Sequence, residues 1–302
     1  MQFMNPITDF AFKKIFGVEE NKDLLISLIN SIVSKDDQVA GVTLLNPYNP
    51  KNFKTDKLSI LDIKAMGIDG KRFNIEIQIS DEADYDKRAL YYWAKLYTEQ
   101  LNVAQGYHGL SKAIGIHILN FTSIPDTKNY HNVFHITEKE NSLVYFKDLE
   151  LHTIELNKFS NDANEELADI VKKVKTSLDM WSTFLTRNDL LKADNLPKGL
   201  NDDHLKKALT VLEVMNFTKE ERSSYEDHLK WLMIEASTVK KAQDKAEAKG
   251  RLEGILEGRV EGRVEGRVER NIEIAKNLLK SGLDTKLIST ATGLSIDEIN
   301  KL

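Results

Sequence analysis

The first 160 residues combine two patterns of apolar positions. Apolar residues at helical spacing predict helices over residues 8–16, 21–33 and 84–102. Short apolar or alternating runs predict strands over residues 42–46, 57–66, 72–80, 113–121, 132–138 and 144–156. Helices and strands that alternate along one region are typical of a mixed α/β domain.

The pattern becomes helical after residue 160. Apolar residues recur at helical spacing in two runs, Leu167, Ile170, Val171, Val174 and Leu178, and later Ala208, Leu209, Leu212 and Met215. This spacing predicts a helical subdomain over residues 161–248 that follows the α/β part, residues 1–160. We expect Trp181, Phe184 and Leu185 to form its core, the alternative being a platform on which bases stack.

A glycine repeat follows, with Gly250, Gly254, Gly258, Gly262 and Gly266 spaced four residues apart. On a helix, a four-residue step advances about 40° beyond one turn, so valine, glutamate, glycine and arginine form four slowly winding stripes. Small residues let two helices approach closely, and the Glu and Arg flanks can pair across the contact, which predicts self-association. Each glycine also weakens a helix by about 1 kcal/mol relative to alanine, so a flexible connector over residues 249–270 is the alternative.

Residues 271–302 predict a small helical unit whose turns are marked by Gly282 and Gly293. Ser295 and Glu298 have the spacing of a capping box. The arrangement is similar to a helix-turn-helix, but the last helix offers two acidic residues and a single lysine, which repels phosphate more than it attracts it. This composition favours a role in packing or partner binding.

Acidic and amide side chains interrupt two neighbouring strand-like runs, Leu58–Ala65 and Phe73–Ile79. Because side chains alternate along a strand, Glu76 and Gln78 share one face, opposite a face of isoleucines. An antiparallel sheet with one wet face gives the same alternation, so a solvated polar face is an equal alternative to a functional one.

The turn between these runs contains Asp69-Gly70, a dipeptide that favours a β-hairpin. Antiparallel pairing through this hairpin brings Asp62 and Glu76 within reach of one cation. Two neighbouring carboxylates repel each other unless a proton or a metal neutralises them, and hard oxygen ligands suit magnesium or manganese. The pattern therefore predicts a metal-assisted hydrolysis site in outline.

Four segments together resemble the Rpn family of recombination-promoting nucleases and transposases: residues 8–17 (TDFAFKKIFG), 61–65 (LDIKA), 74–78 (NIEIQ) and 88–97 (RALYYWAKLY). That family is similar to the wider PD-(D/E)XK nucleases. The resemblance covers nearly the whole chain in order, including the helical second half and the glycine-rich tail. It implies a restriction-endonuclease-like core, a mixed sheet flanked by helices, followed by a helical subdomain and a helical tail.

The resemblance implies roles for the polar residues of the two strands. Asp62 matches the first metal-binding aspartate, although no proline precedes it, and Glu76 matches the acidic residue of the E-x-K element. Gln78 stands where most PD-(D/E)XK enzymes keep lysine, and a neutral amide orients a water but offers no positive charge to the transition state. Glutamine is this family's own residue, which argues for altered chemistry rather than a dead site. The implied cofactor is Mg²⁺, with Mn²⁺ as a substitute.

Two further residues extend the expected site and leave alternatives open. Lys64, on the face of Asp62, is a candidate for the charge missing at Gln78, or else an edge-strand lysine that opposes aggregation. Asp9, on the first helix, is a third candidate metal ligand, or else it caps that helix, as Thr8 also can.

Two helices carry residues suited to DNA. The first leaves Lys13 available, and the second places Arg88, Tyr92 and Lys95 on one stripe that can grip a phosphate backbone. The alternative for the second helix is that its aromatic residues belong to the core and that Arg88 pairs with Asp84. The candidate DNA-binding residues are Lys13, Lys64, Arg88, Tyr92 and Lys95.

Composition narrows the function classes. A chain of 302 residues, 41% hydrophobic and 29% charged, can bury one substantial core. The net charge of −5 argues against broad adhesion to DNA, so any duplex contact must come from a local cluster. The absence of cysteine excludes thiolate catalysis, and His131 and His135 lie in a predicted strand, where their spacing does not suit the helical zinc motif. With no membrane-length apolar run and no signal-peptide order at the start, we expect a cytoplasmic protein.

These observations favour a metal-dependent DNA endonuclease that hydrolyses phosphodiester bonds. The resemblance further implies a role in DNA recombination or transposition, or in defence against mobile elements. The alternative is a catalytically weak DNA- or protein-binding module on a nuclease-derived fold, which forms homo-oligomers through the Gly250–Gly266 repeat.

Overall fold

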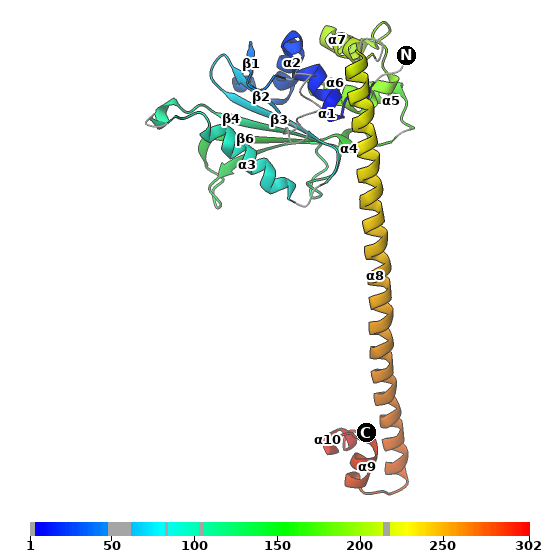
Figure 1. The fold of residues 1–302 in the computed structure, drawn as a ribbon. Helices are drawn as coiled ribbons and strands as arrows, with labels where there is room; N and C mark the ends of the chain where they lie inside the picture. Colours follow the sequence, from blue (N-terminus) through cyan, green and yellow to red (C-terminus); the bar gives the residue numbers. More distant parts are fainter. Residues whose placement is uncertain (1–3, 48–61, 82–83, 103–105, 163, 214–217) are drawn as a thin grey trace. The chain divides into compact units, whose positions relative to one another are not determined.

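The computed structural model describes residues 4–47, 62–81, 84–102, 106–162, 164–213 and 218–302 (Figure 1). The chain divides into two compact units, Met1–His228 and Leu229–Leu302, which are described separately below. The mixed α/β class and the order of helices and strands agree with the sequence pattern.

A mixed six-stranded sheet organises the first unit, in the order β1-β2-β3-β4-β6-β5. Its strands are β1 (Val42–Leu44), β2 (Asp62–Gly67), β3 (Arg72–Gln78), β4 (Ala113–Leu119), β5 (His131–Thr137) and β6 (Val144–Glu155). The first five residues of the strand predicted over 57–66 lie outside the described residues.

The pairing of the strands confirms the predicted hairpin. β2 and β3 are antiparallel, and Gly70 in their connecting turn has a left-handed φ of 88°, which a glycine adopts without steric cost. β3 pairs with β4, and β4 with β6, in parallel. β1 pairs with the other side of β2, so Lys64 is on an interior strand and the edge-strand alternative for this residue is wrong.

Helices surround the sheet. In the first unit these are α1 (Asp9–Phe16), α2 (Lys22–Ile32), α3 (Tyr85–Thr98), α4 (Leu156–Phe159), α5 (Leu167–Lys173), α6 (Ser177–Arg187) and α7 (Asp203–Leu212). The remaining helices are α8 (Lys219–Lys280), α9 (Thr285–Thr292) and α10 (Ile296–Ile299). Short 3-10 turns occupy Glu19–Asn21, Lys35–Asp37, Tyr107–Gly109, Asn188–Leu190 and Lys198–Leu200.

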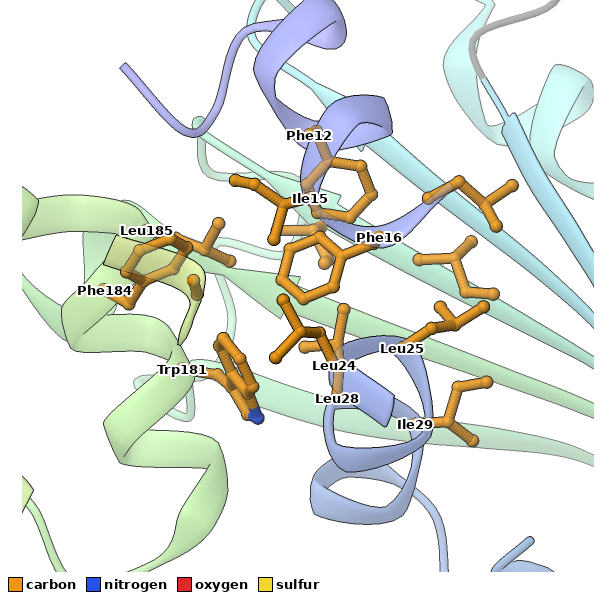
Figure 2. Close-up of a cluster of buried hydrophobic side chains, with 14 of the residues drawn as sticks. Phe12, Ile15, Phe16, Leu24, Leu25, Leu28, Ile29, Trp181, Phe184 and Leu185 are labelled. Atoms are coloured by element: carbon orange, nitrogen blue, oxygen red, sulfur yellow. The ribbon is translucent and has the colours of Figure 1, made fainter. Parts of the chain in front are cut away.

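The main hydrophobic core lies between one face of the sheet and the helices α1, α2, α6 and α7 (Figure 2). β3 and β4 contribute alternate residues to it: Phe73, Ile75, Ile77, Ile114, Ile116 and Ile118. Trp181, Phe184 and Leu185 of α6 are buried in this core, as predicted, and the rings of Trp181 and Phe16 meet edge to face with centroids 5.3 Å apart. The helices after residue 160 therefore share one core with the α/β part. Met215 of the predicted helical run lies outside the described residues.

The connection between β3 and β4 includes α3, which contacts both strands. Tyr85 and Ala89 of this helix pack on Leu119, a residue on the face of β4 opposite to the main core. Figure 1 shows α3 on one side of the sheet and α1 and α2 on the other. A parallel pair with helices on both faces has two buried faces, and this crossover decides the environment of the polar residues on β3.

The second unit contains a three-helix C-terminal end. Ala275 of α8, Ile288 of α9 and Ile299 of α10 are buried together with Leu294. The predicted capping box is confirmed, because Ser295 accepts from the Glu298 amide and the Glu298 carboxylate accepts from the Ser295 amide. The glycine repeat lies entirely within α8 and is helical, which differs from a flexible connector. Within the described part of the chain, we find no helix that is both long and apolar enough to cross a membrane.

Replacing Trp181 with alanine should destabilise the first unit by about 3–5 kcal/mol, because it removes a fully buried indole and leaves a cavity against Phe16 and Phe184. Urea unfolding followed by fluorescence and circular dichroism measures this change. Leu90→Ala, at a side chain that is 52% exposed on α3, is the control and should change stability by less than about 0.5 kcal/mol. Equal effects of the two substitutions would contradict the assignment of Trp181 to the core.

Candidate active site

A row of polar residues crosses four adjacent strands at one level. Asp62 on β2 is directly opposite Glu76 on β3, which is opposite His117 on β4, which is opposite Thr153 on β6. Residues directly opposite each other in a ladder belong to the same face of the sheet. The backbone register therefore brings Asp62 and Glu76 together as predicted, while the Asp62 side chain lies outside the described part of the structure.

The polar side chains of β3 are buried. Asn74, Glu76 and Gln78 are at most 5% exposed, because α3 covers their face of the sheet. The alternative of a solvated polar face is therefore wrong. Asn74 donates a hydrogen bond through Nδ2 to Oε1 of Glu76 at 2.8 Å, which offsets part of the cost of burying this carboxyl group.

Arg88 of α3 brings a positive charge to Gln78. Its Nη2 donates to Oε1 of Gln78 at 2.7 Å, while Nε2 of Gln78 donates to the carbonyl of Ser80 at 3.2 Å. The guanidinium also lies over the ring of Tyr85, 5.5 Å from its centroid. The sequence pattern placed Arg88 on a DNA-binding stripe and did not indicate its contact with Gln78, which depends on how α3 crosses the sheet.

Lys64 lies farther from Gln78 than the sequence pattern suggested. It is opposite Asn74, two pairs along the ladder from Glu76, and its Nζ is 3.4 Å from Oε2 of Glu99 at the end of α3. Oε1 of the same Glu99 is 3.6 Å from Nζ of Lys95. Glu99 thus holds two of the candidate DNA-binding lysines near one end of the helix.

The exposed side of α3 carries aromatic residues. Tyr91 is 62% exposed and its ring contacts that of half-buried Tyr92, with centroids 5.6 Å apart. Trp93 is half-buried and donates to the carbonyl of Ala113, and Leu96 is buried. The alternative was that the aromatic residues of this helix belong to the core. It is partly right for Trp93, which is half-buried, and wrong for Tyr91, which is exposed.

His117 is a residue of this region that the sequence pattern did not single out. It is 2% exposed, its Nδ1 is 3.9 Å from Oε2 of Glu76, and its ring meets that of Tyr85 edge to face. Neither ring nitrogen has a hydrogen-bond partner among the described residues. Burial, together with the charges of His152 and Arg88, holds the pKa of His117 down at about 4, so the imidazole is neutral at pH 7.

The first helix differs from expectation at two positions. Thr8 is the N-cap of α1 and accepts from the amide of Ala11, so Asp9 is not the cap. Asp9 is buried with one carboxyl oxygen 3.5 Å from Nζ of Lys13, and burial raises the pKa of Asp9 although Lys13 opposes the shift. Lys13 is itself buried, so the expectation that its ammonium is available at the surface is wrong.

The comparisons with known proteins bear on this arrangement. A family model described as PD-(D/E)XK nuclease family transposase matches residues 6–242. The chain belongs to this family. A second model, described as the Rpn/YhgA-like nuclease family C-terminal HTH domain, matches residues 268–302. Both matches agree with the resemblance seen in the sequence. Neither the curated proteins nor the solved structures give a match.

The second match also changes the interpretation of the C-terminal unit. Its helix-turn-helix spacing is confirmed, and a helix-turn-helix is a DNA-binding element. The role in packing or partner binding that we inferred from the acidic last helix is therefore less well supported than DNA binding.

The polar row fits the divalent cation that PD-(D/E)XK nucleases typically use. Glu76 is a buried carboxyl group with a second acidic residue, Asp62, directly opposite on the neighbouring strand, and oxygen donors of this kind suit a hard cation. Among the residues with described side chains, which do not include Asp62, no group of three or more metal-binding side chains is close enough to hold an ion.

A second polar cluster lies on the other face of β6. Glu150 accepts from Lys112 and from Nε2 of His152, and these bonds hold the pKa of Glu150 down at about 2 although its burial opposes this shift. Because a carboxylate only accepts, His152 donates to Glu150 through Nε2, and its Nδ1 is 2.9 Å from Nε2 of His131. Nε2 of His135 is 3.6 Å from Oε2 of Glu150. His131 and His135, both on β5, therefore belong to this cluster.

Stability should fall as the pH decreases from about 6.5 to 4. Burial and the charge of His152 lower the pKa of His131 to about 4 from 6.5, so between these values the unfolded chain binds a proton that the folded chain does not. Urea unfolding across this pH range should give a shallower dependence for His131→Gln than for the wild type. His108→Gln, at an exposed histidine, is the control, and a dependence that His131→Gln leaves unchanged would contradict this origin.

Proposed function

We propose that this protein is a metal-dependent DNA endonuclease that hydrolyses phosphodiester bonds and serves DNA recombination, transposition or defence against mobile elements. The observation that carries the proposal is the buried Glu76, opposite Asp62 and two residues from the Gln78–Arg88 pair, in a chain of the PD-(D/E)XK nuclease family. Two acidic residues directly opposite each other offer oxygen donors that suit a hard cation, and the family supplies the reason for one.

Asp62 and Glu76 are the proposed ligands of Mg²⁺ or Mn²⁺, and Asp9 is a third candidate. An ion held by these carboxylates would polarise the phosphate and acidify the attacking water. The α3 helix keeps bulk water away from Glu76, which strengthens electrostatic interactions at this site.

Gln78 and Arg88 act together in this proposal. The amide orients the attacking water, while the guanidinium supplies the positive charge that lysine supplies in most PD-(D/E)XK enzymes. During hydrolysis the water oxygen bonds to phosphorus, the bond from phosphorus to one ester oxygen breaks, and that oxygen takes up a proton.

DNA contact outside the reacting phosphate is assigned to α3. Tyr92, Lys95 and Lys64 lie on or beside this helix, which makes a local basic cluster on a chain of net charge −5. Duplex binding by so acidic a chain requires such a cluster. The helix-turn-helix at residues 268–302 supplies a second DNA contact in this proposal.

The direct test is nicking of supercoiled plasmid by the purified full chain with Mg²⁺, with Mn²⁺ or with a chelator. The wild type should nick only with a metal, and Asp62→Asn and Glu76→Gln should each lower the rate by roughly a hundredfold or more. Arg88→Gln should have an effect of similar size because it removes the charge beside Gln78.

Lys87→Gln is the matched control for Arg88→Gln. It removes one positive charge from the preceding position of α3, where the side chain is exposed and pairs with Asp84. It should leave the rate within about twofold, the effect expected of an exposed ion pair. No nicking by the wild type with any metal, together with retained DNA binding, would favour the alternative of a binding module on a nuclease-derived fold.

We also propose that the glycine repeat joins two copies of the chain. Along α8, residues four apart carry the same charge, such as Arg259 and Arg263 or Glu257 and Glu261, and like charges at this spacing destabilise an isolated helix. Glycine at every fourth position weakens it further. A second copy can place glutamate beside arginine and cover an exposed apolar stripe: Leu252, Leu256, Val260, Val264 and Val268.

Changing Arg259, Arg263 and Arg267 to glutamate should convert the oligomer into a monomer, as measured by sedimentation equilibrium. The reciprocal variant, with arginine at Glu257, Glu261 and Glu265, should also be monomeric. Mixing the two variants should restore association because opposite charges then meet between different chains. A chain lacking residues 250–269 whose mass in solution is unchanged would exclude this interface.

A further inference from the structure

We infer that His117 is a nitrogen ligand of the metal held by Asp62 and Glu76, and that it biases this site toward Mn²⁺ over Mg²⁺. The inference rests on the proposed metal site and adds a ligand and an ion preference to it. It assigns a function to a buried histidine on the central strand β4.

The strand register brings His117 to the site. His117 and Glu76 are directly opposite each other on parallel strands, and Glu76 is opposite Asp62 on its other side, so Glu76 lies between the two other proposed ligands. Nδ1 of His117 is 3.9 Å from Oε2 of Glu76. Two ligands that each lie about 2.1 Å from a shared ion are about 3–4 Å apart, so both atoms can reach the same ion.

The hydrogen bonding of the row points to a ligand at this position. Both ring nitrogens of His117 lack a hydrogen-bond partner among the described residues, and so does Oγ1 of Thr153, the next residue of the row. Buried polar atoms almost always have partners, and an unpaired one costs about 1–3 kcal/mol. A bound cation accepts the Nδ1 lone pair and removes part of this cost.

The surroundings of the ring keep Nδ1 at the row. A Cβ atom on Gly115, two residues earlier on the same face, would be 2.7 Å from Cδ2 of Leu151 and 3.0 Å from Nε2 of His117, so the glycine leaves room for both side chains. Tyr85 of α3 closes the other side through an edge-to-face contact with centroids 5.8 Å apart. With its ring held between these neighbours, His117 presents Nδ1 to Glu76.

An imidazole ligand changes which ion the site prefers. Mg²⁺ takes oxygen ligands almost exclusively, whereas first-row transition ions bind imidazole more readily. The carboxyl groups of Asp62 and Glu76 suit both kinds of ion, so His117 is the residue that discriminates between them. Removing the imidazole should therefore weaken Mn²⁺ binding more than Mg²⁺ binding.

Pulsed electron paramagnetic resonance of the full chain loaded with Mn²⁺ tests the inference without relying on activity. The wild type should show the ¹⁴N modulation of a coordinated imidazole. His117→Gln should lose this signal and bind Mn²⁺ roughly tenfold to a hundredfold more weakly in a titration of the free-ion spectrum, while its Mg²⁺ affinity changes less.

His152→Gln is the matched control, because it replaces a buried histidine of the adjacent strand β6 on the opposite face of the sheet. It should keep both the signal and the affinity. Circular dichroism of each metal-free variant checks folding, and the spectrum of the wild type stays decisive if a variant does not fold.

The outcomes separate this inference from the proposed function. Mn²⁺ binding that Glu76→Gln abolishes but that shows no ¹⁴N modulation in the wild type would overturn the role of His117 and leave the carboxylate site intact. Retention of the ¹⁴N signal in His117→Gln would also overturn it. A wild type that binds no Mn²⁺ would overturn both the inference and the metal site on which it rests.

Discussion

The burial of an acidic side chain in the middle of the sheet is the constraint on which the remainder of this structure depends. A carboxylate removed from water loses several kcal/mol of solvation unless charges or hydrogen bonds replace it. Glu76 has the amide of Asn74 at 2.8 Å, the His117 imidazole at 3.9 Å and an acidic residue directly opposite. The helix α3 encloses these groups and provides Arg88 at the next level of the same strand. One crossover connection thus creates the dry environment of the row and brings a positive charge to Gln78 on the same strand.

Much of this arrangement follows from local patterns that the sequence displays openly. The period of two along β2 and β3, with Asp69-Gly70 between them, is enough to predict the hairpin and the register of Asp62 with Glu76. The helices and their caps follow from apolar spacing and from Thr8 and Ser295. The burial of Trp181 follows from its place on an apolar helical stripe, although the pattern does not show that the α/β part shares its core.

Contacts between distant segments explain what the pattern left out. The parallel pairing of β3 with β4 depends on the path of α3, so nothing local to residue 117 indicates that His117 lies beside Glu76. The contact of Arg88 with Gln78 has the same origin. Lys64, which the sequence suggested as the source of the positive charge missing at Gln78, pairs with Glu99 instead. Lys13 shows the converse error, since a charge on an amphipathic helix is expected in water, but Asp9 one turn earlier lets it be buried.

The order of the strands along the chain determines when the polar row assembles during synthesis. The hairpin that carries Asp62 and Glu76 leaves the ribosome well before β4 and β6, and a two-stranded hairpin is at best marginally stable by itself. The core beneath it also requires α6 and α7, and α7 ends only at Leu212. A nascent chain therefore carries Asp62 and Glu76 without a surface able to hold them in place, and the polar row is complete only when most of the first unit has been made.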